Sequence, residues 1–207
     1  MLIWALSGYP ALAEFSGVLQ GHQEKAREAL QVSERTGSVN ARTYARMGIG
    51  FAHILAGEWA AAASILTEAL EASRGAVVHE APHILALLAE SHLRLGDADE
   101  ARAAATRAIE LARRSNRLYE PQALIALSRV LMHSDAQEDR AAIERLLDEA
   151  AAAVRATGAQ SFAPVIHERR ARLARQHGDD QLAESELREA HRQYTEIGAS
   201  GHAERLG

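Results

Sequence analysis

Residues 50–70, with the sequence GFAHILAGEWAAAASILTEAL, carry the pattern that decides the fold. The small residue Gly50 stands seven positions before Gly57, Ala62 stands five positions after it, and Ala69 follows after seven more. A glycine between two apolar, alanine-rich segments indicates a tight turn between helices, because glycine adopts a left-handed backbone without steric cost. Small residues on both sides of the turn allow the helices to approach closely. The stretch therefore predicts a pair of antiparallel helices.

The same spacing recurs along the chain and indicates a repeat. A partial copy surrounds Gly21, and a copy with a glycine-free turn at 133–139 is needed to fill the interval between Gly96 and Gly178. The two further complete copies consist of Ala89, Gly96, Ala101 and Ala108, and of Ala171, Gly178, Ala183 and Ala190. We predict a single domain with units at about 1–37, 38–76, 77–117, 118–158 and 159–197, followed by a capping segment at 198–207.

Composition supports a purely helical chain. Alanine, which has the highest intrinsic helix propensity, provides 44 of the 207 residues, whereas aromatic residues make up only 4%. We predict an all-α fold in which Asp97 and Asp179, beside turn glycines, cap the helices that follow them. The expected helices lie near 10–20, 22–36, 38–55, 58–73, 81–95, 97–115, 120–133, 138–157, 161–177 and 179–197, with a short one from 200.

The turn Ala56-Gly57-Glu58-Trp59, together with Ala62 and Ala69-Leu70, resembles the tetratricopeptide repeat (TPR). The resemblance covers nearly the whole chain, although its units are longer than the usual repeat of about 34 residues. It implies a right-handed α-solenoid of about five antiparallel helix pairs. It also implies a protein-binding role, in which the first helix of each unit lines a concave groove.

The C-terminal segment carries a more specific resemblance, in ARLARQHG at 171–178, ELREAH at 186–191 and YTEIGA at 194–199. These stretches resemble the last repeat of large bacterial signalling proteins that join a class III adenylate/guanylate cyclase domain, an ATPase domain and a TPR tail. Related tails occur in ATP-dependent transcriptional activators. The resemblance implies a regulatory tail, since this sequence contains no G-x-x-x-x-G-K-[ST] phosphate-binding loop.

Charge and cysteine content narrow the function classes. The net charge of −5 disfavours a dedicated nucleic-acid binder, which needs clustered basic residues for its phosphate contacts. No apolar run is long enough to cross a bilayer, and the absence of cysteine excludes disulfides and thiolate metal sites. We therefore expect a cytoplasmic protein that binds neither nucleic acid nor membrane and needs no cofactor.

One catalytic pattern occurs in the sequence. His79-Glu80-Ala81-Pro82-His83 matches H-E-x-x-H, in which two histidines one helical turn apart bind zinc and the glutamate activates water. That chemistry requires one continuous helix, but Pro82 favours a helix start and Gly75 favours a loop before it. A metalloprotease is therefore the least favoured function, and we predict a chain without enzymatic activity.

Counting from the positions of Gly50 and Ala89 assigns side chains to the concave groove. They begin with apolar and aromatic residues and continue to basic ones, which suits an extended peptide or helix with an apolar and then an acidic sequence. The predicted groove residues are Tyr44, Met47, Phe51, His83, Glu90, Arg94, Arg129, His133 and Arg172. Alternatively, the first three pack against a neighbouring helix or a second subunit.

The sequence thus predicts a non-catalytic interaction module, the regulatory tail of a bacterial signalling protein, that reversibly binds a protein or peptide. The rival prediction is an assembly element that forms a homodimer. Apolar residues near the start of the chain favour this rival, because a solenoid end without a polar cap exposes apolar surface. These residues are Leu2, Ile3, Trp4 and Leu6.

Overall fold

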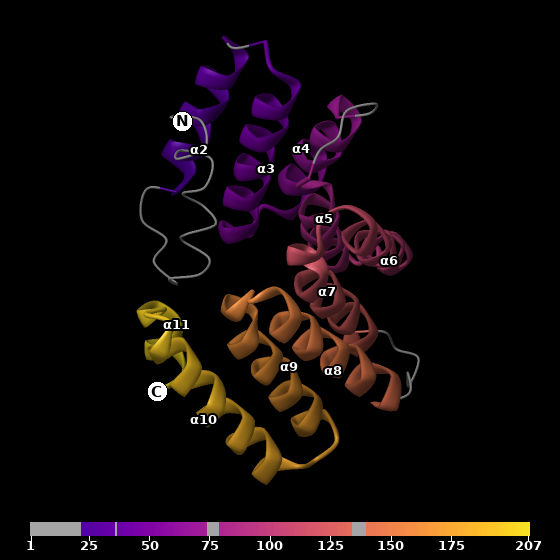
Figure 1. The fold of residues 1–207 in the computed structure, drawn as a ribbon, viewed down its shortest axis with the longest axis vertical. Coiled ribbons are helices and arrows are strands. Elements are labelled where there is room, and N and C mark those ends of the chain that lie inside the picture. Colours follow the sequence, from indigo (N-terminus) through magenta and orange to yellow (C-terminus); the bar gives the residue numbers. More distant parts are fainter. Residues whose placement is uncertain (1–21, 36, 74–78, 134–139) are drawn as a thin grey trace.

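Antiparallel helices follow one another along an arc (Figure 1). The computed structural model describes residues 22–35, 37–73, 79–133 and 140–207, and these contain ten α-helices, two 3-10 helices and no strand. The all-α solenoid fold predicted from the sequence is confirmed. The elements are α2 (His22–Glu34), α3 (Val39–Leu55), α4 (Trp59–Ala72), α5 (Ala81–Leu95), α6 (Ala98–Ser115), η1 (Arg117–Tyr119), α7 (Glu120–His133), α8 (Arg140–Thr157), η2 (Gln160–Phe162), α9 (Ala163–Gln176), α10 (Asp180–Glu196) and α11 (Ser200–Leu206).

The predicted helix limits agree with the observed ones to within two residues. The helix expected at 10–20 lies outside the described residues. Proline occupies the first turn of three inner helices, where its missing N–H leaves no hydrogen bond unmade. These prolines are Pro82 in α5, Pro121 in α7 and Pro164 in α9.

The two predicted aspartate caps differ in the structure. The carboxylate of Asp179 accepts a hydrogen bond from the backbone N–H of Leu182 at 3.0 Å and so caps α10 as predicted. The prediction was wrong for Asp97. This residue occupies the N-cap of α6, but its side chain makes no capping hydrogen bond to the helix. Its carboxylate lies instead 3.5 Å from Nδ1 of His92 on the preceding helix, and this contact competes with capping.

The helices form two layers. The inner layer consists of α3, α5, α7 and α9, which contact one another in that order, and the second helix of each unit, α4, α6, α8 or α10, packs on the first. The helices at the two ends of the arc, α2 and α11, lie on the same side of the molecule (Figure 1). The inner layer therefore borders a concave face, with α11 at one end of it.

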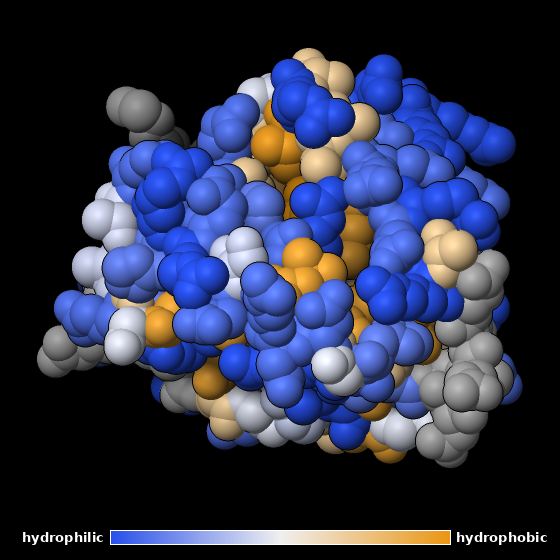
Figure 2. Space-filling model, turned by 90° about the horizontal axis from the view of Figure 1, so that it is seen from below, coloured by the Kyte–Doolittle hydropathy of each residue, from blue (hydrophilic) through white to orange (hydrophobic). Residues whose placement is uncertain are grey.

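Apolar side chains between the helices form two large clusters. One cluster surrounds Phe51 and Leu66 and joins α3, α4 and α5, whereas the other surrounds Leu124, Leu147 and Ile166 and extends from α5 to α9. On the face drawn in Figure 2, hydrophobic residues show only as small islands between hydrophilic ones. None of the helices in the described part of the chain has the length and apolar character needed to span a bilayer.

The pair α3 and α4 shows why the repeat uses small residues. Gly57, in the turn, has a φ of +74°, the left-handed region that favours glycine. At the crossing of the two helices, a Cβ on Gly50 would lie 2.5 Å from Cγ of Leu66. Because that distance is far inside van der Waals contact, the helices could not pack this closely with any larger residue at position 50.

We expect Gly50→Ala to lower the free energy of unfolding by about 1–3 kcal/mol, because the added methyl overpacks the crossing. The direction of this change is informative, because helix propensity alone would make alanine more stable than glycine at a helical position. Chemical denaturation would measure the effect. As a control, the same change is made in a Leu66→Ala protein, where the shorter side chain leaves space for the methyl group and Gly50→Ala should cost little. A Gly50→Ala protein as stable as the wild type would show that the crossing does not require glycine.

Candidate functional site

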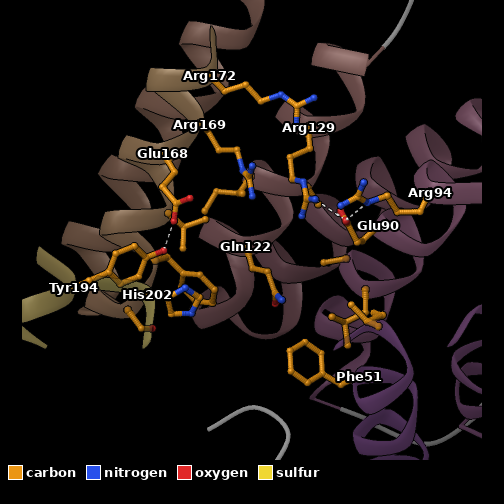
Figure 3. A pocket seen from close by; sticks show the side chains of 18 of the residues that line it. Phe51, Glu90, Arg94, Gln122, Arg129, Glu168, Arg169, Arg172, Tyr194 and His202 are labelled. Carbon is orange, nitrogen blue, oxygen red and sulfur yellow. Dashed lines mark hydrogen bonds and ion pairs between the residues drawn. The ribbon is translucent and has the colours of Figure 1, made fainter. Parts of the chain in front are cut away.

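A cavity of about 410 Å³, called the concave pocket below, opens on the inner layer (Figure 3). Its walls come from α3, α5, α7 and α9 and, at the C-terminal end, from η2, α10 and α11. Ligand sites typically enclose about 300–1,000 Å³, so the space suits a small molecule or a few residues of a peptide. The pocket exists because the arc brings together segments that are far apart in the sequence.

One side of the concave pocket is apolar. Three of its side chains, Ile54, Phe162 and Val165, are only half-buried, so a guest that covered them would remove apolar surface from water. The whole set is Phe51, Ile54, Ala86, Leu87, Ile125, Ala126, Phe162 and Val165.

The remainder of the pocket is polar, and most of its residues are charged. Within the described residues, five arginines and two glutamates line it, which leaves three positive charges in a protein whose net charge is −5. Glu90 of α5 accepts hydrogen bonds from Arg129 of α7 at 2.5 Å and from Arg94 at 3.2 Å. This carboxylate is thereby shared between two guanidinium groups, and it links neighbouring inner helices.

The second glutamate, Glu168 of α9, is bound by the C-terminal elements. It accepts from the hydroxyl of Tyr194 on α10 at 2.6 Å and from the guanidinium of Arg205 on α11 at 2.8 Å. Burial by itself would raise the pKa of Glu168, but these hydrogen bonds outweigh it and lower that pKa. The ring of Tyr194 also stacks on His202 with centroids 4.7 Å apart. These contacts hold α11 against the end of the pocket.

Arg169 of α9 projects into the pocket between these two glutamates (Figure 3). Its Nε is buried and has no hydrogen-bond partner among the residues that the structure describes, and the same holds for the Nε of Arg129. Burial, reinforced by the positive charge of Arg129, lowers the pKa of Arg169 to about 10. The guanidinium nevertheless remains protonated at neutral pH, so the pocket contains a half-buried cation whose buried Nε–H has no acceptor among the described residues.

Arg172 and His133 form a short network at the edge of the pocket. The guanidinium of Arg172 donates to Nε2 of His133 at 2.9 Å, and Nδ1 of that ring lies 2.8 Å from the carbonyl oxygen of Arg129. Both bonds form together only if the imidazole is neutral and carries its proton on Nδ1. Burial and the two positive charges lower the pKa of His133, despite the bond to the carbonyl, and so favour the neutral form.

The nine predicted groove residues, all of them within the described ranges, occupy three different environments. Five line the concave pocket, namely Phe51, Glu90, Arg94, Arg129 and Arg172. Met47 and His83 are buried, with 6% and 7% of their surface exposed, and are not part of the pocket lining. Tyr44 is half-buried away from the pocket, and His133 is held at its edge by Arg172.

Several pocket residues were not predicted from the sequence. Arg169 and Glu168 lie one turn before Arg172 on the same helix, so a wider window along that helix would have found them. Three further polar residues come from the second helix of the last unit and from the capping helix, where a rule based on first helices gives no signal. They are Tyr194, His202 and Arg205.

The H-E-x-x-H segment does not form a zinc-binding helix. His79 lies in the turn before α5, Glu80 occupies the N-cap, and the helix begins only at Ala81. The ring of His83 lies edge-on to those of Phe51 and Tyr119, with centroids 6.5 and 5.1 Å apart. The described residues contain no cluster of three or more metal-ligating side chains.

Acid is expected to destabilise the protein through His83. Burial lowers the pKa of His83 to about 4, whereas an unfolded histidine titrates near 6.5, so between these values only the unfolded chain binds the proton. Stability contributed by the neutral ring is present above pH 6.5 and is lost as the pH falls, by about 3 kcal/mol at pH 4.

Urea denaturation of wild type and His83→Leu at several pH values would measure this loss. The difference in unfolding free energy between the two proteins should change by this amount from pH 7 to pH 4, since other titrating groups are common to both. A constant difference would contradict the assignment of a depressed pKa to His83.

The sequence matches no protein-family model and no curated protein, but a number of solved structures share its fold, including the two that follow. BtubC (BKLC) from P. vanneervenii superposes with a TM-score of 0.64 at 15% identity, over 91% of this chain and 88% of BtubC. A Rap protein complexed with Competence and Sporulation Factor superposes with a TM-score of 0.66 at 14% identity, over 99% of this chain but 62% of the Rap protein. At these identities the likeness concerns the fold, and this chain has the fold of a TPR-like helical repeat.

Proposed function

We propose that the chain is a non-catalytic interaction module that binds a peptide or an extended protein segment in the concave pocket. The observation that carries the proposal is the composition of the pocket, in which half-buried apolar side chains adjoin a group of arginines on successive inner helices. A guest with both apolar and acidic groups matches this arrangement. The Rap protein, which shares the fold, was solved with Competence and Sporulation Factor bound.

We further propose that the module acts as the regulatory tail of a bacterial signalling protein in the cytoplasm. The resemblance of residues 171–206 to the tails of cyclase- and ATPase-containing regulators supports this role. Binding of the guest would then be transmitted to a catalytic or DNA-binding domain of the signalling protein. The solenoid suits such transmission, because each unit contacts mainly its neighbours and a change of curvature affects the whole arc.

Homodimerisation remains a separate prediction. It rests on Leu2, Ile3, Trp4 and Leu6, which lie outside the described residues. No contact within the described residues adds support to it, so we retain peptide binding as the proposed function.

Selection of peptides from a displayed library on the immobilised chain, followed by fluorescence anisotropy, would test the proposal. We expect Phe162→Ala to weaken the selected peptides roughly tenfold or more, because it removes an aromatic contact from the apolar side of the pocket. Leu118→Ala is the matched control, since this side chain is 53% exposed and lies outside the pocket lining. Peptides that bind both variants as tightly as the wild type, or a library that yields no binder, would contradict the proposal.

A further inference from the structure

The arginines of the concave pocket are more numerous than their partners. Both glutamates of the pocket are already engaged, Glu90 by Arg129 and Arg94, and Glu168 by Tyr194 and Arg205. Arg172 donates to His133, which is a neutral acceptor. Arg169 therefore has no carboxylate partner within the described part of the chain, and its buried Nε donates to no group there.

A structural role does not account for this arrangement. Arg169 is only partly buried, but its Nε–H is buried without an acceptor among the described residues, which lowers stability, and an apolar or neutral side chain of similar size would usually be better tolerated there. The charge of Arg129 adds to the cost and lowers the pKa of Arg169 further, the charges of Glu168 and Glu90 offset part of it, and Arg172 adds a smaller unfavourable contribution. Positive charges gathered in one pocket of an acidic protein point to a negatively charged ligand that completes them.

We propose that Arg169, with Arg129 and Arg172 beside it, binds a carboxylate group of the guest peptide. A planar guanidinium offers paired N–H donors that match the two oxygens of a carboxylate, which a lysine could not provide in the same geometry. An apolar residue next to this carboxylate would lie on Phe162 and Ile125, which line the same pocket. This inference rests on the proposed function and defines the chemistry of the guest.

The geometry assigns separate roles to the arginines. Arg129 is oriented by Glu90 on the neighbouring helix (Figure 3). Arg172 is oriented by His133, so both groups are already held in place. The Nε–H of Arg169 has no acceptor among the described residues, so Arg169 is the residue whose hydrogen bonds the carboxylate would complete. Its removal should therefore abolish anion binding without loosening the fold, whereas removal of Arg129 would also leave Glu90 short of one partner.

The first test uses small anions as probes and needs no peptide. Sodium acetate and sodium phosphate are titrated into the full chain against sodium chloride at equal ionic strength, with the melting temperature and the ¹H–¹⁵N signals of the arginine Nε groups recorded. We expect acetate to raise the melting temperature of the wild type and to shift the Arg169 signal. Arg169→Gln should lose both responses, and Arg155→Gln, which changes an exposed arginine outside the pocket, should keep them.

The same variants separate a ligand site from a structural cation. Without added anions, Arg169→Gln should melt at the same temperature as the wild type or higher, because the change removes a buried N–H that lacks an acceptor in the described part of the chain and the repulsion from Arg129 and Arg172. A marked fall in its melting temperature would identify Arg169 as a structural residue and overturn the proposal. Equal stabilisation of wild type and Arg169→Gln by acetate would overturn it too, as would a response to phosphate with none to acetate.

The second test uses the peptides selected on the chain. Replacing their acidic residues one at a time by the neutral amide, and the C-terminal carboxylate by a carboxamide, should identify one carboxylate whose loss weakens binding roughly tenfold or more. That loss should be absent in Arg169→Gln. If peptides bind but no neutralisation matters, the proposed function stands and the carboxylate site fails. If acetate binds at Arg169 but no peptide is selected, the anion site stands and the peptide-binding function fails.

Discussion

The close approach of the two helices within each unit is the constraint on which the rest of the structure depends. At the crossing of α3 and α4, the backbone at Gly50 packs directly against Leu66, and the equivalent positions in the next unit, Ala89 and Ala105, are completely buried. A solenoid has few contacts other than those between neighbours, so the spacing inside each pair also governs how successive pairs stack. The concave face follows from that stacking.

The pocket on this face combines an apolar surface and a charged surface, which contribute differently to the stability of the fold. Apolar side chains in the pocket extend the hydrophobic core and contribute to stability whether or not a guest is present. Arg129 and Arg169 contribute much less, because partial burial removes much of their hydration and Glu90 and Glu168, which are shared with other groups, replace it only in part. The molecule therefore retains a group of charges that its own residues compensate only in part. Such a group is explained more readily by recognition of a ligand than by folding.

Much of the fold could be predicted from local spacing, and less of the site. Helix limits and turn positions depend on neighbouring residues, and they were predicted to within two residues. The groove prediction placed Phe51 and Arg129 on the side that forms the pocket, but Met47 and His83 pack into the core. Met47 lies one turn before Phe51, and His83 one turn before Ala86, on the same helix faces, so a residue count finds the face but cannot tell where along it the pocket ends.

By itself, then, the sequence determined that this protein is a chain of paired helices with glycine turns, because helix propensity, capping and close helix contacts act over a few residues. Only the tertiary structure decided which charges are paired. Glu90 meets Arg129 from a position 39 residues away, and Arg205 reaches Glu168 because α11 folds back onto α9. Arg169 is left without a carboxylate as a consequence of those long-range contacts, since an ion pair depends on distance in space and not on separation in sequence.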